Sequence, residues 1–319
     1  MRDWVECCSF PGQSPRSQER AKNGRGEPWK LPYFGVGNEN WGCGGNMTAE
    51  RYADEYRRYA TYVRKLGPDP IERIACGPNN TDWHWTEVLM RDVFAPKPNL
   101  IQGLSLHYYT VPRAWNKKGP ATGFDAAGWH EPLKKTHHMG ELLRRHGAIM
   151  DHYDPARKVN LVVDEWGTWY DVEPGTNPGF LYQQNSIRDA LVAAVNFHHF
   201  QEHPARVRMA NIAQTVNVLQ AMVLTDGARM LLTPTYHVFR MFKVHHDATA
   251  LALAVETPDL AWNEEKYPAV TASASRAASG ELHVSLSNAS LDSAASVKCL
   301  VRGAEVTRYT GELLSADAM

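Results

Sequence analysis

The chain lacks the features that mark a membrane, nucleic-acid-binding or secreted protein. Its 34 basic and 35 acidic residues nearly cancel to a formal net charge of -1, so nothing favours nucleic acid or an anionic lipid surface as a partner. No stretch approaches the roughly 18 uncharged apolar residues of a membrane-spanning helix. The opening MRDWVECCSF has no apolar core of the kind found in signal peptides. We therefore expect a cytoplasmic location, with neither nucleic acid nor membrane as a partner.

Cysteine is also scarce, and its five positions fit neither a disulfide framework nor a zinc site. The number is odd, and the spacing of Cys7, Cys8, Cys43, Cys76 and Cys299 contains no CxxC. We expect buried thiols in a reducing compartment. Histidines occur as adjacent pairs, which do not face one ligand on a helix. No metal site is therefore expected at the pairs His137-His138, His198-His199 and His245-His246.

What remains is the composition of a globular protein that is rich in aromatic side chains. The 319 residues suffice for one large α/β domain and a smaller one, and the proportions of 43% hydrophobic and 22% charged residues are ordinary. Ten tryptophans and thirteen tyrosines are many for this length. These rings could pack a core or stack on sugars, and composition does not separate the two interpretations.

Short apolar runs alternate with helical patterns along most of the chain. After a helical piece at 2–8 and a Pro/Gly-rich loop at 11–29, each run is followed by a loop and an amphipathic segment. Five such units predict a parallel sheet covered by helices. We expect strands at 33–38, 71–76, 100–109, 158–165 and 208–214. We expect one helix capped by Thr48 and further helices at 83–92, 131–152 and 183–202.

A change of periodicity marks a second domain. Residues 222–232 predict a hairpin around Asp226-Gly227, and Thr233-Pro234 opens a helix that runs to about residue 244. From about residue 247, apolar and polar residues alternate with period two, as in ELHVSLSNAS, which predicts an all-β module. We therefore expect a partial (β/α) barrel at 1–245 and an incomplete β-sandwich at 246–319.

Two segments each place a carboxylate beside an indole where an apolar run ends. In LVVDEWGTWY, the buried-strand pattern Leu161–Val163 leads to Glu165, and in YFGVGNENW a shorter run leads to Asn38 and Glu39. Catalytic groups lie at the carboxyl ends of barrel strands. Glycoside hydrolases use two carboxyl groups that face one another across the scissile bond. The alternative for Glu165 is a solvated acid in a loop. The two glutamates can meet only if the sheet curls.

Other polar and aromatic residues follow the same strands. His107 and Tyr109 share one face of their strand, because side chains alternate with period two, and they could orient a carboxylate nucleophile or form a hydrogen-bonded core pair. Gln214, at the end of the fifth run, could reach the same cavity. Aromatic faces suited to sugars, or to plugging a barrel mouth, are Trp41, Trp83, Trp85, Trp115 and Trp169.

These motifs resemble the α-L-arabinofuranosidases of glycoside hydrolase family 51. The resemblance rests on YFGVGNENWG, GLSLHYYT, VDEWGTWY and NIAQTVNVLQA followed by TDGARMLLTPTYHVF, and it covers nearly the whole chain. It implies a (β/α)8 barrel with a jelly-roll sandwich, a retaining mechanism, no metal or organic cofactor, arabinose-containing oligosaccharides as substrates and a homo-oligomer. It matches Glu39 to the acid/base and Glu165 to the nucleophile. Residues matched to the arabinofuranose subsite are Asn38, His107, Tyr109, Trp169 and Gln214.

The chain also departs from the family pattern. The strand that ends at Glu39 corresponds to the fourth barrel strand, so the first three βα units, with a glutamate and an asparagine near the sugar, have no counterpart. Five strands cannot close a barrel that needs eight. We therefore expect a fragment of a longer product, or a second copy that covers the open side. Alternative functions are another retaining barrel glycosidase, such as an endo-glucanase or β-xylosidase, and a non-catalytic sugar-binding fragment.

Overall fold

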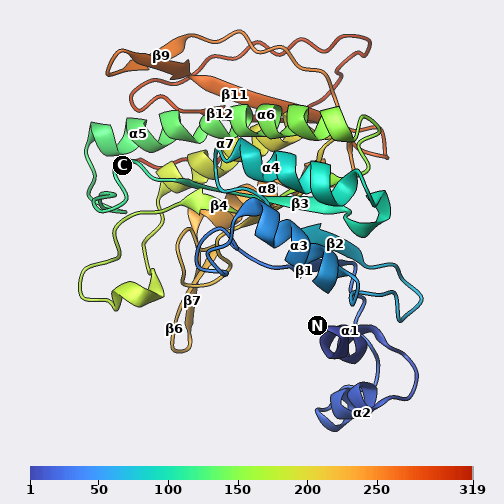
Figure 1. Ribbon diagram of the computed structural model, residues 1–319. Coiled ribbons are helices and arrows are strands. Elements are labelled where there is room, and N and C mark those ends of the chain that lie inside the picture. Colours follow the sequence, from blue (N-terminus) through green and yellow to red (C-terminus); the bar gives the residue numbers. More distant parts are fainter. Residues whose placement is uncertain (318–319) are drawn as a thin grey trace. The chain divides into compact units, whose positions relative to one another are not determined.

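Five strands form the sheet that carries the candidate site residues (Figure 1). Neighbours in this sheet are neighbours in the sequence, and β1 pairs with β2, and β2 with β3, in parallel. Sequential order is typical of a β/α barrel, whereas doubly wound sheets reverse their order. All five predicted strands are confirmed. The computed structural model, which describes residues 1–317, gives them as β1 (Tyr33–Val36), β2 (Glu72–Ala75), β3 (Gly103–Thr110), β4 (Asn160–Thr168) and β5 (Val207–Ile212).

The chain divides into two compact units, and the division runs through β3 and β4. His107 belongs to one unit and Tyr109 to the other, although both stand on β3, and the consecutive Asp164 and Glu165 are divided in the same way. The first unit comprises Met1–Tyr108, Leu142–Asp164 and Ala205–Ala210, and the second comprises Tyr109–Glu141, Glu165–Pro204 and the described chain from Asn211 onward.

In the first unit, helix α3 (Ala49–Ala60) fixes the loops that follow β1 and β2. Thr48 caps this helix, as predicted. The buried Tyr52 hydroxyl donates to the Val36 carbonyl at 2.5 Å and accepts the Cys76 N–H at 2.7 Å. A buried hydroxyl that uses both its donor and its acceptor in this way holds the ends of two strands to one helix. The unit also contains α1 (Arg2–Ser9), α4 (Trp83–Leu89), a π-helical turn at Met90–Phe94 and a 3-10 turn at Pro98–Leu100.

The predicted loop at 11–29 is wrong where the chain forms helix α2 (Pro15–Lys22). Ser14 and Ser17 make a reciprocal cap, because each hydroxyl accepts the other's backbone N–H, at 3.1 and 2.8 Å. Pro15 occupies the first helical position, where its missing N–H costs nothing. This charged segment forms a helix through its caps and lacks the apolar stripe that sequence periodicity detects.

A buried ion pair fastens the strand at one edge of the sheet within the first unit. Arg206, just before β5, lies 3.1 Å from the Asp154 carboxylate, also pairs with Asp151, and donates to the Val159 carbonyl at 2.7 Å. The side chains of Arg206 and Asp154 are only 6% and 1% exposed. Each buried charge therefore depends on the other for compensation.

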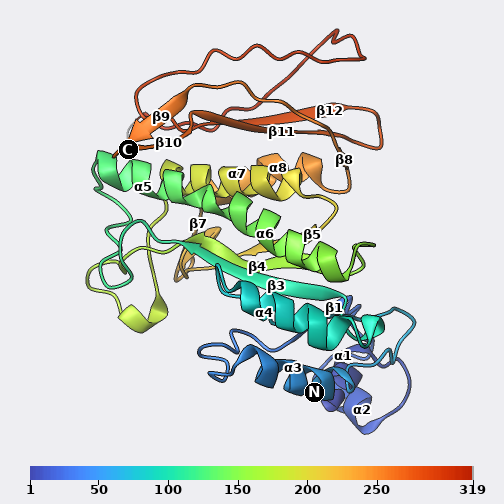
Figure 2. The same ribbon diagram turned by 45° about the horizontal axis from the view of Figure 1, so that its top comes forward.

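The second unit layers a small sheet over two helices. Strands β11 (Val270–Arg276) and β12 (Leu282–Asn288) pair antiparallel and lie against α7 (Ile187–Glu202), with α8 (Pro234–Phe242) beside that helix (Figures 1 and 2). The hairpin, the helix at Thr233-Pro234 and the β-rich C-terminal region are confirmed. The other elements are β6 (Val223–Asp226), β7 (Arg229–Leu232), β8 (Thr249–Ala250), β9 (Asp259–Trp262), β10 (Glu265–Pro268) and the 3-10 turns Pro178–Phe180 and Lys243–His245.

Two histidines join this sheet to the helices beneath it. The buried His198 of α7 places its ring nitrogens 2.9 Å from the Ser273 hydroxyl and 3.0 Å from the Ser287 hydroxyl. His245 contacts two further serines of β11 and β12, Ser275 and Ser285, in the same way. Burial lowers the pKa of His198 to about 3, with neighbouring histidines adding to the effect. The seam between sheet and helices is therefore built from neutral imidazoles.

The predicted single helix at 131–152 is two helices, α5 (Ala126–Thr136) and α6 (His138–Tyr153). Neither Gly nor Pro stands at 136–138, so the periodicity gives no sign of this boundary. Among residues 1–317, no helix is both long and apolar enough to cross a membrane. Within the same residues the five cysteines form no disulfide; the expected burial is confirmed for Cys76 and wrong for the exposed Cys43 and Cys299.

Candidate active site

Glu39 stands on a tight turn directly after β1. Its φ of 46° is left-handed, and the carbonyl of Glu39 accepts the N–H groups of Gly42 at 2.8 Å and Gly44 at 2.9 Å. A Cβ on Gly44 would lie 1.7 Å from the carbonyl oxygen of Asn38, so only glycine lets the turn close. The GNENWGCGG segment therefore holds its glutamate on a fixed backbone, while Asn38 itself is exposed.

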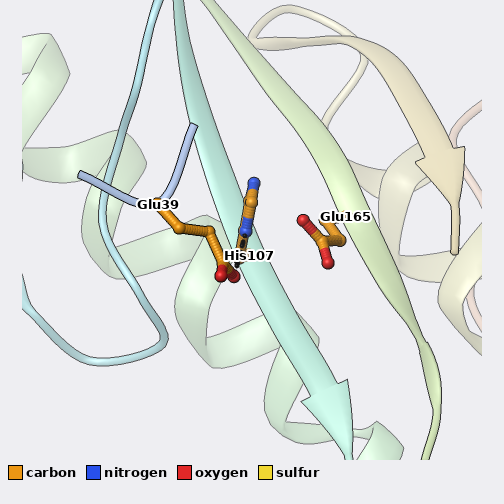
Figure 3. A group of neighbouring side chains, drawn as sticks. All are labelled: Glu39, His107 and Glu165. Atoms are coloured by element: carbon orange, nitrogen blue, oxygen red, sulfur yellow. Dashed lines mark hydrogen bonds and ion pairs between the residues drawn. The ribbon is translucent and has the colours of Figure 1, made fainter. Parts of the chain in front are cut away.

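The Glu39 carboxylate is held by a buried histidine of β3. His107, 3% exposed, has Nδ1 3.0 Å from Glu39 Oε1, and Figure 3 shows this contact as a dashed line. On the other side of the ring, Nε2 lies 3.1 Å from Asp164 Oδ1, an ion-pair contact without the alignment of a hydrogen bond. The edge of the Trp41 ring system packs near the imidazole, with centroids 6.2 Å apart. Two carboxylates therefore flank one imidazole.

A cysteine completes the surroundings of Glu39. The Cys43 thiol donates to Glu39 Oε2 at 3.1 Å. The hydrogen bond from His107 lowers the pKa of Glu39 below its ordinary value; burial opposes this, and the thiol supports it. Neither Asp164 nor Cys43 was predicted as a partner of the site. Asp164 could have been suspected because it precedes Glu165, whereas the contact of Cys43 arises only from the folded turn.

Glu165 is organised by residues of the second unit. The Tyr109 hydroxyl donates to Glu165 Oε1 at 2.5 Å, and the Trp169 ring meets the Tyr109 ring edge-on at 4.8 Å between centroids. The expectation that this strand ends at Glu165 is wrong, because β4 continues to Thr168. The strand persists through Gly167, whose φ of 138° a side chain would disfavour, and the Thr168 N–H is bound by a buried glutamine, Gln220.

The predicted residues thus form two groups. His107 with Glu39, and Tyr109 with Glu165 and Trp169, are in contact within their own units. Gln214 is exposed just beyond β5, and its backbone N–H donates to the Val218 carbonyl. Figure 3 shows that Glu39 comes from the loop after β1, His107 from β3 and Glu165 from β4. One strand therefore carries the hydrogen-bonding partners of both glutamates.

Carboxylate and imidazole are also metal-ligand types, and Glu39, His107 and Glu165 offer such atoms. A metal would need a lone pair on the imidazole. In this structure each ring nitrogen of His107 already faces a carboxylate oxygen, Glu39 Oε1 at 3.0 Å and Asp164 Oδ1 at 3.1 Å. The contacts of His107 therefore fit a hydrogen-bonding role better than metal ligation.

Comparison with known proteins places these residues in a family. Residues 1–125 match the model of the α-L-arabinofuranosidase 1 domain, and residues 164–319 match that of the α-L-arabinofuranosidase C-terminal domain. An intracellular exo-α-L-arabinofuranosidase of Bacteroides ovatus is 45% identical over 320 residues, which are 100% of this chain and 62% of the relative. An intracellular exo-α-(1→5)-L-arabinofuranosidase of Streptomyces lividans is 25% identical over 270 residues, covering 79% of this chain and 38% of the relative.

Solved structures agree. The crystal structure of the family 51 arabinofuranosidase from Xanthomonas axonopodis pv. citri is 54% identical and superimposes with a TM-score of 0.87, over 90% of this chain and 58% of that one. An α-L-arabinofuranosidase from Thermotoga maritima, solved with arabinose, is 25% identical, with a TM-score of 0.71 over 90% of this chain and 57% of that one. This chain thus spans less than two thirds of the length of these relatives. On these matches, the chain belongs to the α-L-arabinofuranosidases of glycoside hydrolase family 51.

Proposed function

We propose that the chain is an exo-acting α-L-arabinofuranosidase that releases terminal arabinofuranosyl residues from arabinoxylan or arabinan oligosaccharides, with retention of configuration. Membership of the family supports the reaction class, and the Bacteroides ovatus relative is named for exo-acting arabinofuranosidase activity. In this proposal Glu39 is the acid/base and Glu165 the nucleophile. Asn38, His107, Tyr109, Trp169 and Gln214 line the subsite for the terminal sugar.

One observation carries this proposal: each glutamate is hydrogen-bonded to β3. Glu39 is bound by His107 and Glu165 by Tyr109, two side chains on the same face of one strand. Residues i and i+2 of a strand are about 6.6 Å apart. A retaining glycosidase needs its two carboxyl groups about 5–5.5 Å apart, so the residues that bind them must stand close together, as these two do. The common strand therefore supports a shared site for the two carboxylates.

The reaction follows as a double displacement. The Glu165 carboxylate attacks the anomeric carbon while protonated Glu39 gives its proton to the leaving oxygen, which forms a glycosyl ester and frees the alcohol. Glu39, now a carboxylate, takes a proton from water as that water attacks the anomeric carbon; arabinose leaves and Glu165 is regenerated. The lowered pKa of Glu39 suits this second, basic step. Neither step requires a metal or organic cofactor.

The remaining features of the family are proposed for the whole protein. We propose that the α/β sheet is part of a (β/α)8 barrel and that the C-terminal β region is part of a jelly-roll sandwich. The boundary between these two domains lies between residues 245 and 246. Two relatives named as intracellular enzymes support a cytoplasmic location. A homo-oligomer is proposed as the assembled form.

Hydrolysis of 4-nitrophenyl α-L-arabinofuranoside tests the function. We expect turnover by the parent chain, its loss in Glu165→Gln, and rescue of Glu39→Ala by azide with formation of a glycosyl azide of retained configuration. Glu87→Gln, which changes an exposed carboxylate on α4, serves as the matched control and should remain active. Full activity of Glu165→Gln contradicts the assignment. Turnover of aryl β-xylosides or cellobiosides in preference to the arabinofuranoside would replace it with the function of an endo-glucanase or β-xylosidase.

A further inference from the structure

An exposed tryptophan, Trp115, ends a row of aromatic rings that starts at the proposed nucleophile. Tyr109 donates to Glu165, Trp169 lies edge-on to Tyr109, and Trp115 lies edge-on to Trp169 with centroids 5.2 Å apart. Exposure rises along the row, because Tyr109 and Trp169 are half-buried and Trp115 is 60% exposed. A single exposed aromatic side chain is common on protein surfaces and does not by itself indicate a binding site. Here the ring continues an ordered row that leads outward from a carboxylate.

The loop that presents this indole is held firmly. The turn at 114–117 is closed by the Lys117 N–H, which donates to the Ala114 carbonyl at 3.0 Å. The carboxylate of Asp171, just beyond β4, accepts the N–H groups of Lys118 at 3.1 Å and Gly119 at 3.0 Å. The backbone of Asp171 also donates to the Gly119 carbonyl at 3.0 Å. The loop after β3 is therefore clamped to the segment that follows β4.

A cation lies near both indoles. The ammonium group of Lys118 lies 5.8 Å from the Trp115 ring centroid and 5.6 Å from that of Trp169, within the range of cation–π attraction. A ring that is already oriented loses little conformational freedom when a ligand stacks on it. A largely exposed indole contributes little to the core, and its ring face suits the apolar CH face of a sugar ring.

We propose that Trp115 is a stacking platform for the sugar on the leaving-group side of the scissile bond. This inference rests on the proposed function, because the row of rings is read outward from Glu165. The ligand class is a neutral sugar ring of the oligosaccharide that remains after arabinose departs. Two sources share this chemistry: a xylopyranose of a xylan backbone and an arabinofuranose of an arabinan.

Affinity measurements on the hydrolytically blocked chain test the platform. In the Glu165→Gln background, isothermal titration is performed with arabinose, with arabinofuranosyl-xylotetraose and with arabinotriose. We expect Trp115→Ala to reduce the ratio of oligosaccharide affinity to arabinose affinity about tenfold, as befits one lost aromatic contact, and Trp115→Phe to restore most of it. The oligosaccharide whose affinity ratio falls more on Trp115→Ala identifies whether the platform prefers a xylopyranose or an arabinofuranose.

The control is Phe180→Ala, which removes another exposed aromatic ring of the same unit, 69% exposed, and should leave the ratio unchanged. Because the readout is a ratio, a general loss of folded protein does not imitate the effect. A ratio that Trp115→Ala leaves unchanged for both oligosaccharides overturns the platform. Turnover of the aryl arabinofuranoside by the parent chain is scored separately. Its absence, with Trp115-dependent oligosaccharide binding intact, rejects the hydrolase and keeps the platform.

Discussion

Acidification should loosen the seam between β11–β12 and the helices beneath them, and His198 offers a direct measure of it. The folded chain holds this imidazole neutral, because burial lowers its pKa to about 3 from an ordinary 6.5. The unfolded chain binds a proton near pH 6.5 instead. Since the folded-state pKa is the lower one, the contribution of His198 to stability is complete above pH 6.5 and is lost as the pH falls toward 3.

The magnitude follows from this linkage. At pH 5.5, one unit below the ordinary pKa, protonation of the unfolded chain alone makes unfolding easier by about 1.4 kcal/mol. Burial likewise lowers the pKa of His245, half-buried in the same seam, to about 4. Its loss at pH 5.5 has the same sign but is smaller than that of His198, because solvent reaches this ring and screens its charge.

Urea unfolding at pH 7.5 and pH 5.5 measures these losses. Compared with the parent, His198→Gln should show a drop in unfolding free energy between the two pH values that is smaller by about 1.4 kcal/mol. Glutamine keeps one donor and one acceptor for Ser273 and Ser287 but cannot take up the proton. His246→Gln, at an exposed neighbouring position, is the control and should behave as the parent does. An equal drop in His198→Gln and the parent would refute the reasoning.

Three further changes have defined outcomes. Tyr109→Phe removes a hydrogen bond to the Glu165 carboxylate, which is a loss of about 1.5–3 kcal/mol. The value of kcat/KM on an aryl arabinofuranoside should therefore fall about ten- to hundredfold while the circular dichroism spectrum stays unchanged, and a fall below twofold contradicts the positioning role. Cys43→Ala removes an interaction that lowers the pKa of Glu39, so the alkaline limb of the pH–rate profile should move to higher pH. Cys43→Ser should move this limb less, and a limb that stays in place in Cys43→Ala counts against the contact. Arg206→Leu leaves the buried Asp154 without its ion-pair partner, while Asp151 keeps Arg157, and should cost about 3–5 kcal/mol in urea unfolding, whereas a cost under 1 kcal/mol would show that water replaces the guanidinium.

Periodicity was sufficient to predict most of the fold. The five sheet strands, the helix capped by Thr48 and the β-rich C-terminal region follow from apolar spacing and turn residues, which local sequence displays. Helix α2 was missed because it depends on a reciprocal serine cap and not on an apolar stripe. The boundary between α5 and α6 was missed because neither Gly nor Pro marks it.

The candidate site was predicted as a set of residues but not as a set of contacts. The shared face of His107 and Tyr109 follows from strand alternation, but only Tyr109 binds Glu165, the carboxylate both were expected to orient, whereas His107 binds Glu39. Beyond Glu165, β4 is hydrogen-bonded to Gln220, more than fifty residues later, and no local pattern reveals this contact. The thiol beside Glu39 is a local contact, four residues away, but it depends on a glycine-permitted turn geometry that apolar periodicity does not display.

Because His107 and Tyr109 both stand on β3, the contacts of both glutamates depend on the register of this one strand. A slip of one residue would turn His107 and Tyr109 outward together and present Leu106 and Tyr108 in their place. Both glutamates would lose their partners in the same event. Misaligned molecules should therefore lose more activity than either single substitution costs, and the specific activity of a preparation would report mainly the fraction of chains in which β3 has found its register.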